Sequence, residues 1–287
     1  MSHATEQAQL VPTVTLNNGA QIPQLGFGVF QIDPAETAAA VKAALEVGYR
    51  HIDTAEMYRN EQGVGQGIRE SGVDPSTIWV TSKINNNAHG YDKARAAFDQ
   101  TLTDLGTDSI DLILIHWPLP TVGDFVATWK ALESIYAEGR AKTIGVSNFQ
   151  PHHLQKLADE CEIVPVVNQI EVHPYLTQQS LLHYDAEHGI ATEAWSPIAQ
   201  GKVLDNPVIT TIAAAHNKSP AQAVLRWHIQ LGNIVFPKSV NPDRMRENFE
   251  LFDFALTSDE VAAISGLNKN ERTGPDPDKM SWVPGSR

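Results

Sequence analysis

Apolar and polar residues follow two repeating patterns along the chain. Short aliphatic or β-branched runs, typical of buried strands, recur at intervals of roughly 25 to 45 residues, and longer stretches with apolar residues at helical spacing separate them. Eight runs predict strands at residues 24–28, 50–53, 78–83, 111–116, 143–147, 166–170, 191–195 and 234–237. Five stretches predict helices at residues 35–47, 92–105, 124–138, 151–160 and 220–231. Strands and helices in this order predict a (β/α)8 TIM barrel folded as a single domain.

An open, doubly wound sheet is the competing arrangement. Such sheets usually bind a dinucleotide through a GxGxxG motif between the first strand and the first helix. The chain has no such motif. Gly63, Gly65 and Gly67 form only a partial match, and they lie inside a helical pattern, where small residues permit close helix packing. The sequence therefore favours the barrel.

Two segments lie outside the strand and helix repeats. Residues 14–16 and 20–22 flank Asn17, Asn18 and Gly19, and the Asn-Gly pair is expected to supply the positive φ angles of a hairpin turn. We expect this hairpin to plug the bottom of the barrel. Residues 1–12 are expected to form a flexible N-terminus, residues 13–267 the barrel, and residues 268–287 a tail near the active-site mouth.

Composition narrows the class of protein. The chain has 287 residues, of which 42% are hydrophobic and 19% charged, so it can bury a sizeable core. Its 21 Lys and Arg against 34 Asp and Glu give a net charge of −13, which makes nucleic acid and acidic membranes unlikely partners. Cys161, the only cysteine, excludes an intramolecular disulfide and a thiolate zinc site. With neither a membrane span nor a signal peptide in the pattern, we expect a cytoplasmic protein. No strong interface signal is visible, so a monomer is the default expectation.

Titratable residues follow three neighbouring predicted strands. Asp53 ends the second strand and Tyr58 lies five residues later, Lys83 ends the third, and His116 ends the fourth. Singly, each has an ordinary role as a helix cap, half-buried packing, a solvated charge or a core histidine. Because the catalytic groups of a barrel gather at the C-terminal ends of its strands, their joint occurrence there indicates an active site.

These four side chains are suited to donating a proton. Tyrosine titrates near pH 10 in water, and we expect the ammonium group of Lys83 to favour the phenolate and lower the pKa of Tyr58. Asp53 would hold and neutralise Lys83. His116 would hydrogen-bond a substrate carbonyl oxygen and align it with the Tyr58 hydroxyl. The group is that of a carbonyl-reducing site that lacks only a source of hydride.

The motifs around these residues resemble the aldo-keto reductase superfamily. The resemblance runs in order through residues 48–58, 60–61, 83, 115–118, 144–149, 167–174 and 236–240. It implies a barrel that binds NADPH without a Rossmann fold, with Asp53, Tyr58, Lys83 and His116 as the catalytic tetrad and Tyr58 as the proton donor. Segments 195–202 and 220–228 are similar to the bacterial branch that includes the 2,5-diketo-D-gluconate reductases. This branch implies small dicarbonyls, aromatic aldehydes and keto-sugars as substrates.

The resemblance also implies how NADPH binds. Ser147, Asn148 and Gln169 match residues that hold the nicotinamide carboxamide, and Trp195 stands where the family more often stacks a tyrosine on the nicotinamide ring. Lys238 and Arg244 place two cations where the adenosine 2′-phosphate binds, which favours NADPH over NADH. The implied contacts are Ser147, Asn148, Gln169, Trp195, Ser196, Lys238, Ser239, Val240, Arg244, Glu247 and Asn248.

The substrate pocket is expected to be apolar with a few polar groups. Phe30, Met57 and Trp117 would form its wall beside His116. Trp282 of the tail is either a further part of this wall or a core or lid packing residue. After Lys83 many relatives continue with an aliphatic residue and a tryptophan, but residues 84–87 read Ile-Asn-Asn-Asn, so we expect a wider or more polar mouth.

No metal site is expected. The other histidines do not fall in a metal-ligand spacing with Cys or carboxylate support, and adjacent His152 and His153 begin a surface helix.

Two other functions stay open at this point. Barrels that resemble this one can act as NADP-sensing regulatory subunits with little turnover, although no partner-binding insertion is visible. A Schiff-base lyase would use Lys83 as its nucleophile, and it would leave the cations Lys238 and Arg244 without a purpose.

Overall fold

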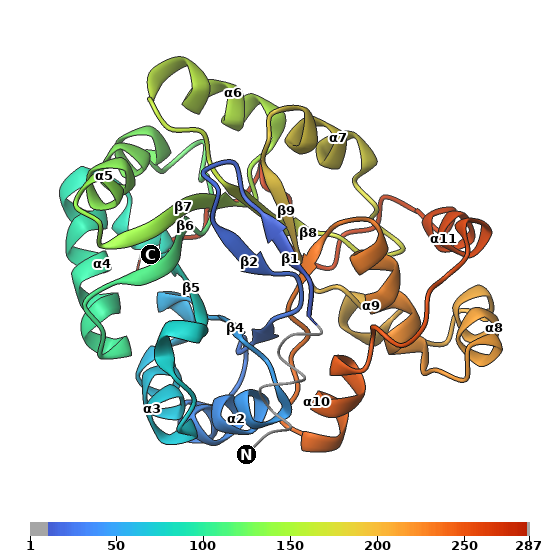
Figure 1. Cartoon of the computed structure of the whole chain (residues 1–287). Coiled ribbons are helices and arrows are strands. Elements are labelled where there is room, and N and C mark those ends of the chain that lie inside the picture. The colour runs from blue at the N-terminus through green and yellow to red at the C-terminus, as the bar shows by residue number, and fades with distance from the viewer. Residues whose placement is uncertain (1–10, 286–287) are drawn as a thin grey trace.

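Eight parallel strands close into a barrel with helices on its outside (Figure 1). The computed structural model describes residues 11–285. The strands are hydrogen-bonded in chain order: β3 (Phe27–Gly28), β4 (His51–Asp53), β5 (Trp79–Ile84), β6 (Ile110–Ile115), β7 (Ala141–Ser147), β8 (Val167–Glu171), β9 (Ala191–Trp195) and β10 (Ile234–Val235). A parallel bridge between Leu25 and Val235 joins the two edges of the sheet. The predicted barrel is confirmed, and the open doubly wound sheet is excluded.

The ends of the strands differ from the prediction mainly where the barrel closes. The predicted strand 24–28 is regular only at Phe27 and Gly28, because Leu25 pairs alone with Val235 across the seam. The last predicted strand, 234–237, is likewise limited to β10. Here the backbones approach closely, since a Cβ atom at Gly28 would lie 2.7 Å from the carbonyl oxygen of Phe236. Glycine at this position lets the first strand meet the last.

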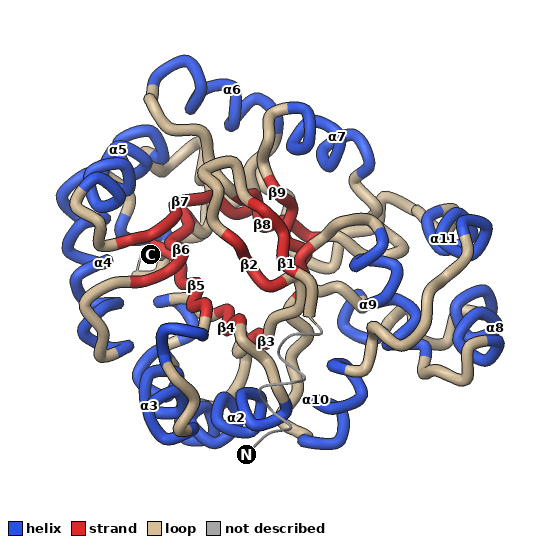
Figure 2. Tube along the Cα trace, viewed as in Figure 1, coloured by secondary structure: helices blue, strands red, loops and turns tan. Residues whose placement is uncertain are grey.

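Helices cover the outer face of the sheet (Figure 2). They are α2 (Pro34–Val47), α3 (Glu61–Ser71), α4 (Tyr91–Leu105), α5 (Phe125–Ala137), α6 (Pro151–Glu160), α7 (Gln179–Glu187), α8 (Pro207–Ala215), α9 (Pro220–Gln230), α10 (Pro242–Phe249) and α11 (Ser258–Ser265). Short 3-10 turns are η1 (Glu56–Tyr58), η2 (Pro75–Thr77), η3 (Asn86–Ala88) and η4 (Ala199–Gly201). The five predicted helices are confirmed within one residue at each end. Within residues 11–285, no helix combines the length and the apolar character needed to span a membrane.

Short polar side chains begin several of these helices. Asp33 accepts a hydrogen bond from the amide of Ala35 at the start of α2, and Asp124 accepts one from the amide of Ala127 at the start of α5. These bonds satisfy backbone donors that have no partner within the helix. The local sequence thus sets where each helix leaves its preceding loop.

The glycines of α3 serve helix packing, as their helical context suggested. A Cβ atom at Gly67 would clash with the backbone of Ala38 in α2, and one at Gly65 would clash with the backbone of Leu105 at the end of α4. The partial glycine motif therefore reflects the close contact of three helices.

Alternate residues of each strand face the inside of the barrel. Trp79 of β5 packs with Leu112 and Val167 in an inner cluster, whereas Ile84 belongs to the larger cluster that the strands form with the helices. Because side chains alternate along a strand, the same rule places Lys83, four residues after Trp79, inside the barrel near its opposite end. The interior is therefore apolar where the strands begin and polar where they end.

An N-terminal hairpin seals the end of the barrel at which the strands begin (Figure 1). Its strands β1 (Thr13–Thr15) and β2 (Gln21–Pro23) are antiparallel, and Leu16 and Ile22 are buried in the inner cluster with Trp79. The predicted plug is confirmed.

The predicted hairpin turn is wrong in detail. Of residues 17–19 only Gly19 has a positive φ, of 86°, and its amide donates to the carbonyl oxygen of Leu16 at 2.9 Å. A tight turn followed by a left-handed glycine replaces the two-residue Asn-Gly turn, because the loop includes Asn17 as well.

Replacing Ile22 by Ala should remove apolar contacts from the plug and lower the free energy of unfolding by about 2–5 kcal/mol. Ile22 is fully buried. Urea unfolding followed by circular dichroism measures the change. Thr15→Ala is the matched control on the exposed side of the same hairpin and should change stability by less than about 0.5 kcal/mol. Equal losses in both variants would show that the hairpin does not pack as a plug.

Candidate active site

Lys83 and Asp53 form a buried ion pair at the C-terminal ends of β5 and β4. Lys83 Nζ lies 2.8 Å and 2.9 Å from the two carboxylate oxygens of Asp53, and it donates a third hydrogen bond to the carbonyl oxygen of Thr54 at 2.8 Å. Burial lowers the pKa of the Lys83 ammonium group, but Asp53 and Tyr58 raise it by more, so it lies above its ordinary value. Lys83 is thus held as a cation. A Schiff-base nucleophile needs a free amine, so this geometry argues against the lyase alternative.

Tyr58 lies beside this pair, at the end of η1. Lys83 Nζ is 5.2 Å from the centre of the Tyr58 ring, and the ring stands edge-on to the imidazole of His116 with 5.9 Å between centroids. The predicted grouping of Asp53, Tyr58, Lys83 and His116 is therefore present in the structure.

The expected effect of Lys83 on the pKa of Tyr58 has the right direction, but burial outweighs it. Burial raises the pKa of the Tyr58 hydroxyl, and the charge of Lys83 lowers it by a smaller amount, so the net shift is upward. Desolvation disfavours the phenolate in the same way as it disfavours any buried charge. Lys83 limits this effect and does not reverse it.

His116 is a neutral donor. It is buried just after β6, and burial together with the charge of Lys83 holds its pKa well below the ordinary value. A neutral imidazole donates through one nitrogen only. Nδ1 has no hydrogen-bond partner among the described residues. The ring is thus suited to hydrogen-bond a carbonyl oxygen without carrying a charge at neutral pH.

The residues expected at the nicotinamide lie together at the ends of β7, β8 and β9. The Ser147 hydroxyl donates to the carbonyl oxygen of Gln169 at 2.8 Å, and Asn148 Nδ2 donates to the carbonyl oxygen of His116 at 2.9 Å. The indole N–H of Trp195 donates to Asn148 Oδ1 at 2.8 Å. Ser196 follows with a φ of 49°, in the left-handed region. The indole is therefore held by the residue that follows β7.

The side-chain amide of Gln169 makes its hydrogen bonds inside the barrel. Its Nε2 donates to Asp53 Oδ2 at 2.8 Å and to Glu193 Oε2 at 2.7 Å. The amide nitrogen is therefore engaged inside the barrel, and only the amide oxygen remains to accept a hydrogen bond from a carboxamide.

The C-terminal tail crosses the end of the barrel that holds these residues. Glu171, the last residue of β8, accepts hydrogen bonds from the amide and hydroxyl of Thr273, each at 2.5 Å, and from the amide of Gly274 at 3.2 Å. Gly274 lies against the ring of Trp195, with which a Cβ atom there would clash. The tail thus lies near the active-site mouth, as expected.

The asparagines after Lys83 also hold the tail. Asn86 Nδ2 in η3 donates to the carbonyl oxygen of Trp282 at 2.9 Å. The Trp282 side chain is 54% exposed, so it is not a packing residue of the core. Asn86 thus anchors the tail across the mouth. The wider or more polar mouth expected from residues 84–87 stays a prediction.

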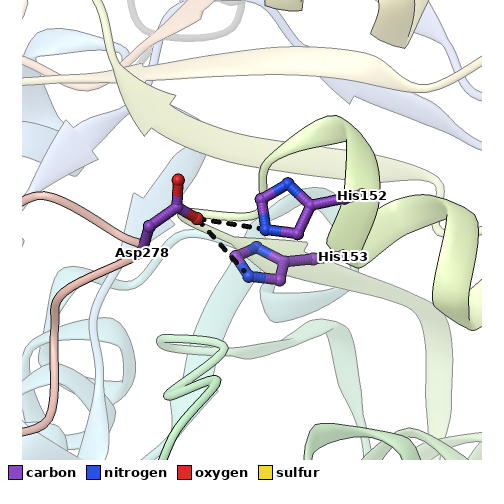
Figure 3. Close-up of side chains that lie close together, drawn as sticks. All are labelled: His152, His153 and Asp278. Atoms are coloured by element: carbon purple, nitrogen blue, oxygen red, sulfur yellow. Dashed lines mark ion pairs between the residues drawn. The ribbon is translucent and has the colours of Figure 1, made fainter.

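A third attachment of the tail involves two histidines at the start of α6 (Figure 3). Asp278 Oδ1 lies 3.2 Å from His152 Nε2 and 3.6 Å from His153 Nε2. The expectation that no carboxylate supports these histidines is wrong, because the tail brings Asp278 to them. The amide of Gln150 donates to Nδ1 of His153 at 3.1 Å, so the neutral ring of His153 carries its proton on Nε2, toward Asp278. A metal ion would need the lone pair of that nitrogen. The geometry therefore fits a polar contact that fastens the tail to α6, and not a metal site.

The residues expected at the 2′-phosphate lie after β10. Lys238 and Arg244 are exposed, and neither forms an ion pair within residues 11–285. The amides of Asp243 and Arg244 at the start of α10 donate to Asn241 Oδ1 at 2.8 Å and 3.2 Å. These two N–H groups of α10 are therefore already capped, which leaves the side chains of Lys238 and Arg244 as the groups suited to a phosphate. The remaining expected contacts are the buried Ser239, the exposed Val240, and the half-buried Glu247 and Asn248.

The three residues expected to line the substrate pocket, Phe30, Met57 and Trp117, differ in exposure. The Phe30 ring is 50% exposed and lies 5.0 Å from the Tyr58 ring, centroid to centroid, and Met57 in η1 is half-buried. Trp117, by contrast, is only 6% exposed. Phe30 and Met57 therefore offer surface beside Tyr58, and Trp117 offers little.

Sequence reasoning missed two buried polar residues below the tetrad. Glu193 of β9 and His51 of β4 are both fully buried. They stand two residues before Trp195 and Asp53, so they share the inward face of their strands. Counting back by two from each strand end would have found them.

Comparison with known proteins places this site in a family. The sequence matches the aldo/keto reductase family over residues 24–269. It is 49% identical over 272 residues to glyoxal reductase of Bacillus subtilis, covering 94% of this chain and 98% of that protein. It is 46% identical over 272 residues to methylglyoxal reductase DkgA of Escherichia coli, with coverages of 94% and 98%.

Solved structures extend the match to cofactor-bound relatives. A Gox0644 variant in complex with NADPH superposes with a TM-score of 0.92 at 43% identity and covers 95% of this chain and 99% of that one. The Bombyx mori aldo-keto reductase in complex with NADP has a TM-score of 0.89 at 38% identity, with coverages of 95% and 98%. Barrel, tetrad and relatives agree: the chain belongs to the aldo/keto reductase family and is an NADP-dependent oxidoreductase.

Proposed function

We propose that this protein reduces small aldehydes and ketones to alcohols with NADPH, and that Tyr58 donates the proton. The grouping of Tyr58 and His116 around the buried Asp53–Lys83 ion pair carries this proposal. The similarity to a glyoxal reductase and a methylglyoxal reductase supports small dicarbonyls as substrates. Aromatic aldehydes and keto-sugars such as 2,5-diketo-D-gluconate are further candidates from the family resemblance.

The four tetrad residues have distinct roles in this reaction. NADPH, when bound, supplies the hydride. His116 hydrogen-bonds the carbonyl oxygen, and Tyr58 gives its proton to that oxygen as negative charge develops there. Lys83 stabilises the phenolate that remains on Tyr58, and Asp53 fixes Lys83. The raised pKa of Tyr58 suits this role, because it keeps the hydroxyl protonated at neutral pH.

The residues around the tetrad fit the cofactor. Trp195 offers a flat indole held in place by Asn148, and the amide oxygen of Gln169 is left to accept from a carboxamide. Lys238 and Arg244 are exposed cations without acidic partners among the described residues. We propose that they bind the 2′-phosphate that distinguishes NADPH from NADH.

Tyr58→Phe should lower the rate of carbonyl reduction by about 100-fold to 10,000-fold, because the variant has no proton to donate. NADPH absorbance is followed with methylglyoxal, phenylglyoxal, a benzaldehyde and 2,5-diketo-D-gluconate, and NADPH affinity is measured by fluorescence. The affinity should be unchanged. Tyr91→Phe is the control, because it makes the same chemical change at an exposed tyrosine at the start of α4, outside the tetrad. Retained turnover in Tyr58→Phe would refute the donor role, and no turnover of wild type with any carbonyl would refute the substrate class.

Arg244→Ala should weaken NADPH binding by about tenfold or more and leave NADH binding unchanged, because it removes a charge-assisted contact to one phosphate. Dissociation constants for both cofactors measure the effect. Arg246→Ala is the matched control on the same helix, since Arg246 is paired with Asp243 at 2.9 Å. An equal loss of affinity for NADPH and NADH would show that Arg244 does not bind the 2′-phosphate.

We also propose that the enzyme works as a cytoplasmic monomer. The large apolar side chains exposed on the described part come from separate segments, and two of them, Phe30 and Trp282, border the mouth. Isolated exposed apolar residues are ordinary on monomers. Sedimentation velocity should give one species near 31.4 kDa at micromolar concentration. A species of twice that mass would refute the proposal.

A further inference from the structure

The interior of the barrel holds a second carboxyl group below the Asp53–Lys83 pair. Glu193 comes from β9 and is fully buried. Its Oε2 accepts a hydrogen bond of 2.7 Å from Gln169 Nε2, and the same nitrogen donates to Asp53 Oδ2 at 2.8 Å. The amide of Gln169 therefore bridges the two carboxyl groups.

The two carboxyl groups differ in how many donors surround them. Asp53 receives hydrogen bonds from Lys83 on both oxygens and another from Gln169. Within residues 11–285, Glu193 receives only the bond from Gln169, and its Oε1 has no hydrogen-bond partner. A buried carboxylate ion needs several donors or a cation. Asp53 has enough donors to be ionised. Glu193 has too few donors to stabilise a carboxylate ion.

No cation among the described residues forms a hydrogen bond or an ion pair with Glu193. The hydrogen bonds of Lys83 go to Asp53 and to the carbonyl oxygen of Thr54. The nearest other basic group is His51, whose Nε2 lies 3.9 Å from Glu193 Oε1.

His51 is itself neutral. Burial lowers the pKa of His51 to about 3. Its Nδ1 lies 3.3 Å from the carbonyl oxygen of Pro23 and so carries the ring proton, while Nε2 faces the hydroxyl of Thr81 at 3.2 Å. The charged and titratable groups around Glu193 are thus the cation Lys83, the anion Asp53 and the neutral His51.

We propose that Glu193 works as a protonated positioning residue, which orients Gln169 toward Asp53, and that its ionisation at alkaline pH slows carbonyl reduction. With Glu193 neutral, the buried charges of Lys83 and Asp53 balance. Loss of the proton to solvent adds an uncompensated negative charge beside them. Burial, with a contribution from the charge of Asp53, raises the pKa of Glu193 to about 8.

The slowing follows from the effect of this charge on Tyr58. A negative charge near the Asp53–Lys83 pair makes the Tyr58 phenolate less favourable, so Tyr58 becomes a weaker proton donor. The proposal therefore rests on the proposed role of Tyr58 as the donor.

The first experiment compares the pH dependence of the turnover rate in wild type and Glu193→Gln. Glutamine keeps the shape and the acceptor for Gln169 but cannot ionise. The wild-type rate should fall by about threefold to tenfold between pH 7 and pH 9. The Glu193→Gln rate should equal that of wild type at pH 7 within about twofold and should stay level over this range. If the glutamine variant is unfolded at the assay temperature, Glu193→Leu, which also cannot ionise, should likewise show a level rate from pH 7 to pH 9. Because leucine lacks the acceptor for Gln169, only the pH dependence of this variant is compared with that of wild type.

Glu61→Gln is the matched control. Glu61 in α3 is another buried carboxyl group, whose pKa burial raises to about 7, and it accepts from Ser82 and Thr101 rather than from the tetrad. This variant should keep the wild-type fall in rate. A fall that persists in Glu193→Gln, or that disappears in Glu61→Gln, would overturn the proposal. So would a Glu193→Gln rate at pH 7 as low as that of Tyr58→Phe.

A second readout does not depend on activity. A carboxyl group that binds its proton more tightly in the folded state loses stabilising effect as pH rises from its unfolded pKa of about 4.3 toward its folded value. The melting temperature of Glu193→Gln relative to wild type should therefore increase from pH 5 to about pH 9 and stay level above. A difference that does not change with pH would show that Glu193 is ionised in the fold. Because this readout does not involve Tyr58, it separates failure of this inference from failure of the donor assignment.

Discussion

The buried ion pair between Lys83 and Asp53 is the constraint around which the site is organised. Removing an ammonium and a carboxylate group from water costs more free energy than their attraction returns, unless hydrogen bonds satisfy the rest of both groups. The barrel provides these bonds from the Thr54 carbonyl and the Gln169 amide. The pair is therefore held at one place by two neighbouring strands and a third across the barrel. A cation fixed in this way can stabilise a phenolate without a side-chain rearrangement during the reaction.

The low polarity of the surroundings explains why the other acidic and basic groups stay neutral. The hairpin and the inner apolar cluster around Trp79 exclude water from the end of the barrel where the strands begin. In such surroundings only a matched pair of charges is tolerated. His51 and His116 accordingly have lowered pKa values, and Tyr58 has a raised one. The site thus combines one ion pair with neutral hydrogen-bond donors.

Much of this arrangement was predictable because it depends on local patterns. Strand alternation and helix spacing depend on neighbouring residues, so the barrel and the positions of the tetrad at strand ends could be inferred. The direction of the pKa shift of Tyr58 could not, since it depends on how much water the folded chain excludes. Nor could the contact of Asp278 with His152 and His153, because nothing near α6 in the sequence indicates where the tail lies. Glu193 is an intermediate case. Strand alternation predicts that it faces inward, but a search limited to the last residue of each strand does not find it.

Two segments far apart in the sequence close opposite ends of the same barrel. The hairpin seals the end at which the strands begin, and Thr273, Gly274 and Asp278 attach the tail across the other end. The floor of the site is built by the barrel strands, whereas its rim at Trp195 depends on contact with Gly274 of the tail. The buried ion pair and the shape of the mouth are therefore set by different segments, so a substitution in the tail can reshape the mouth and leave the tetrad in place.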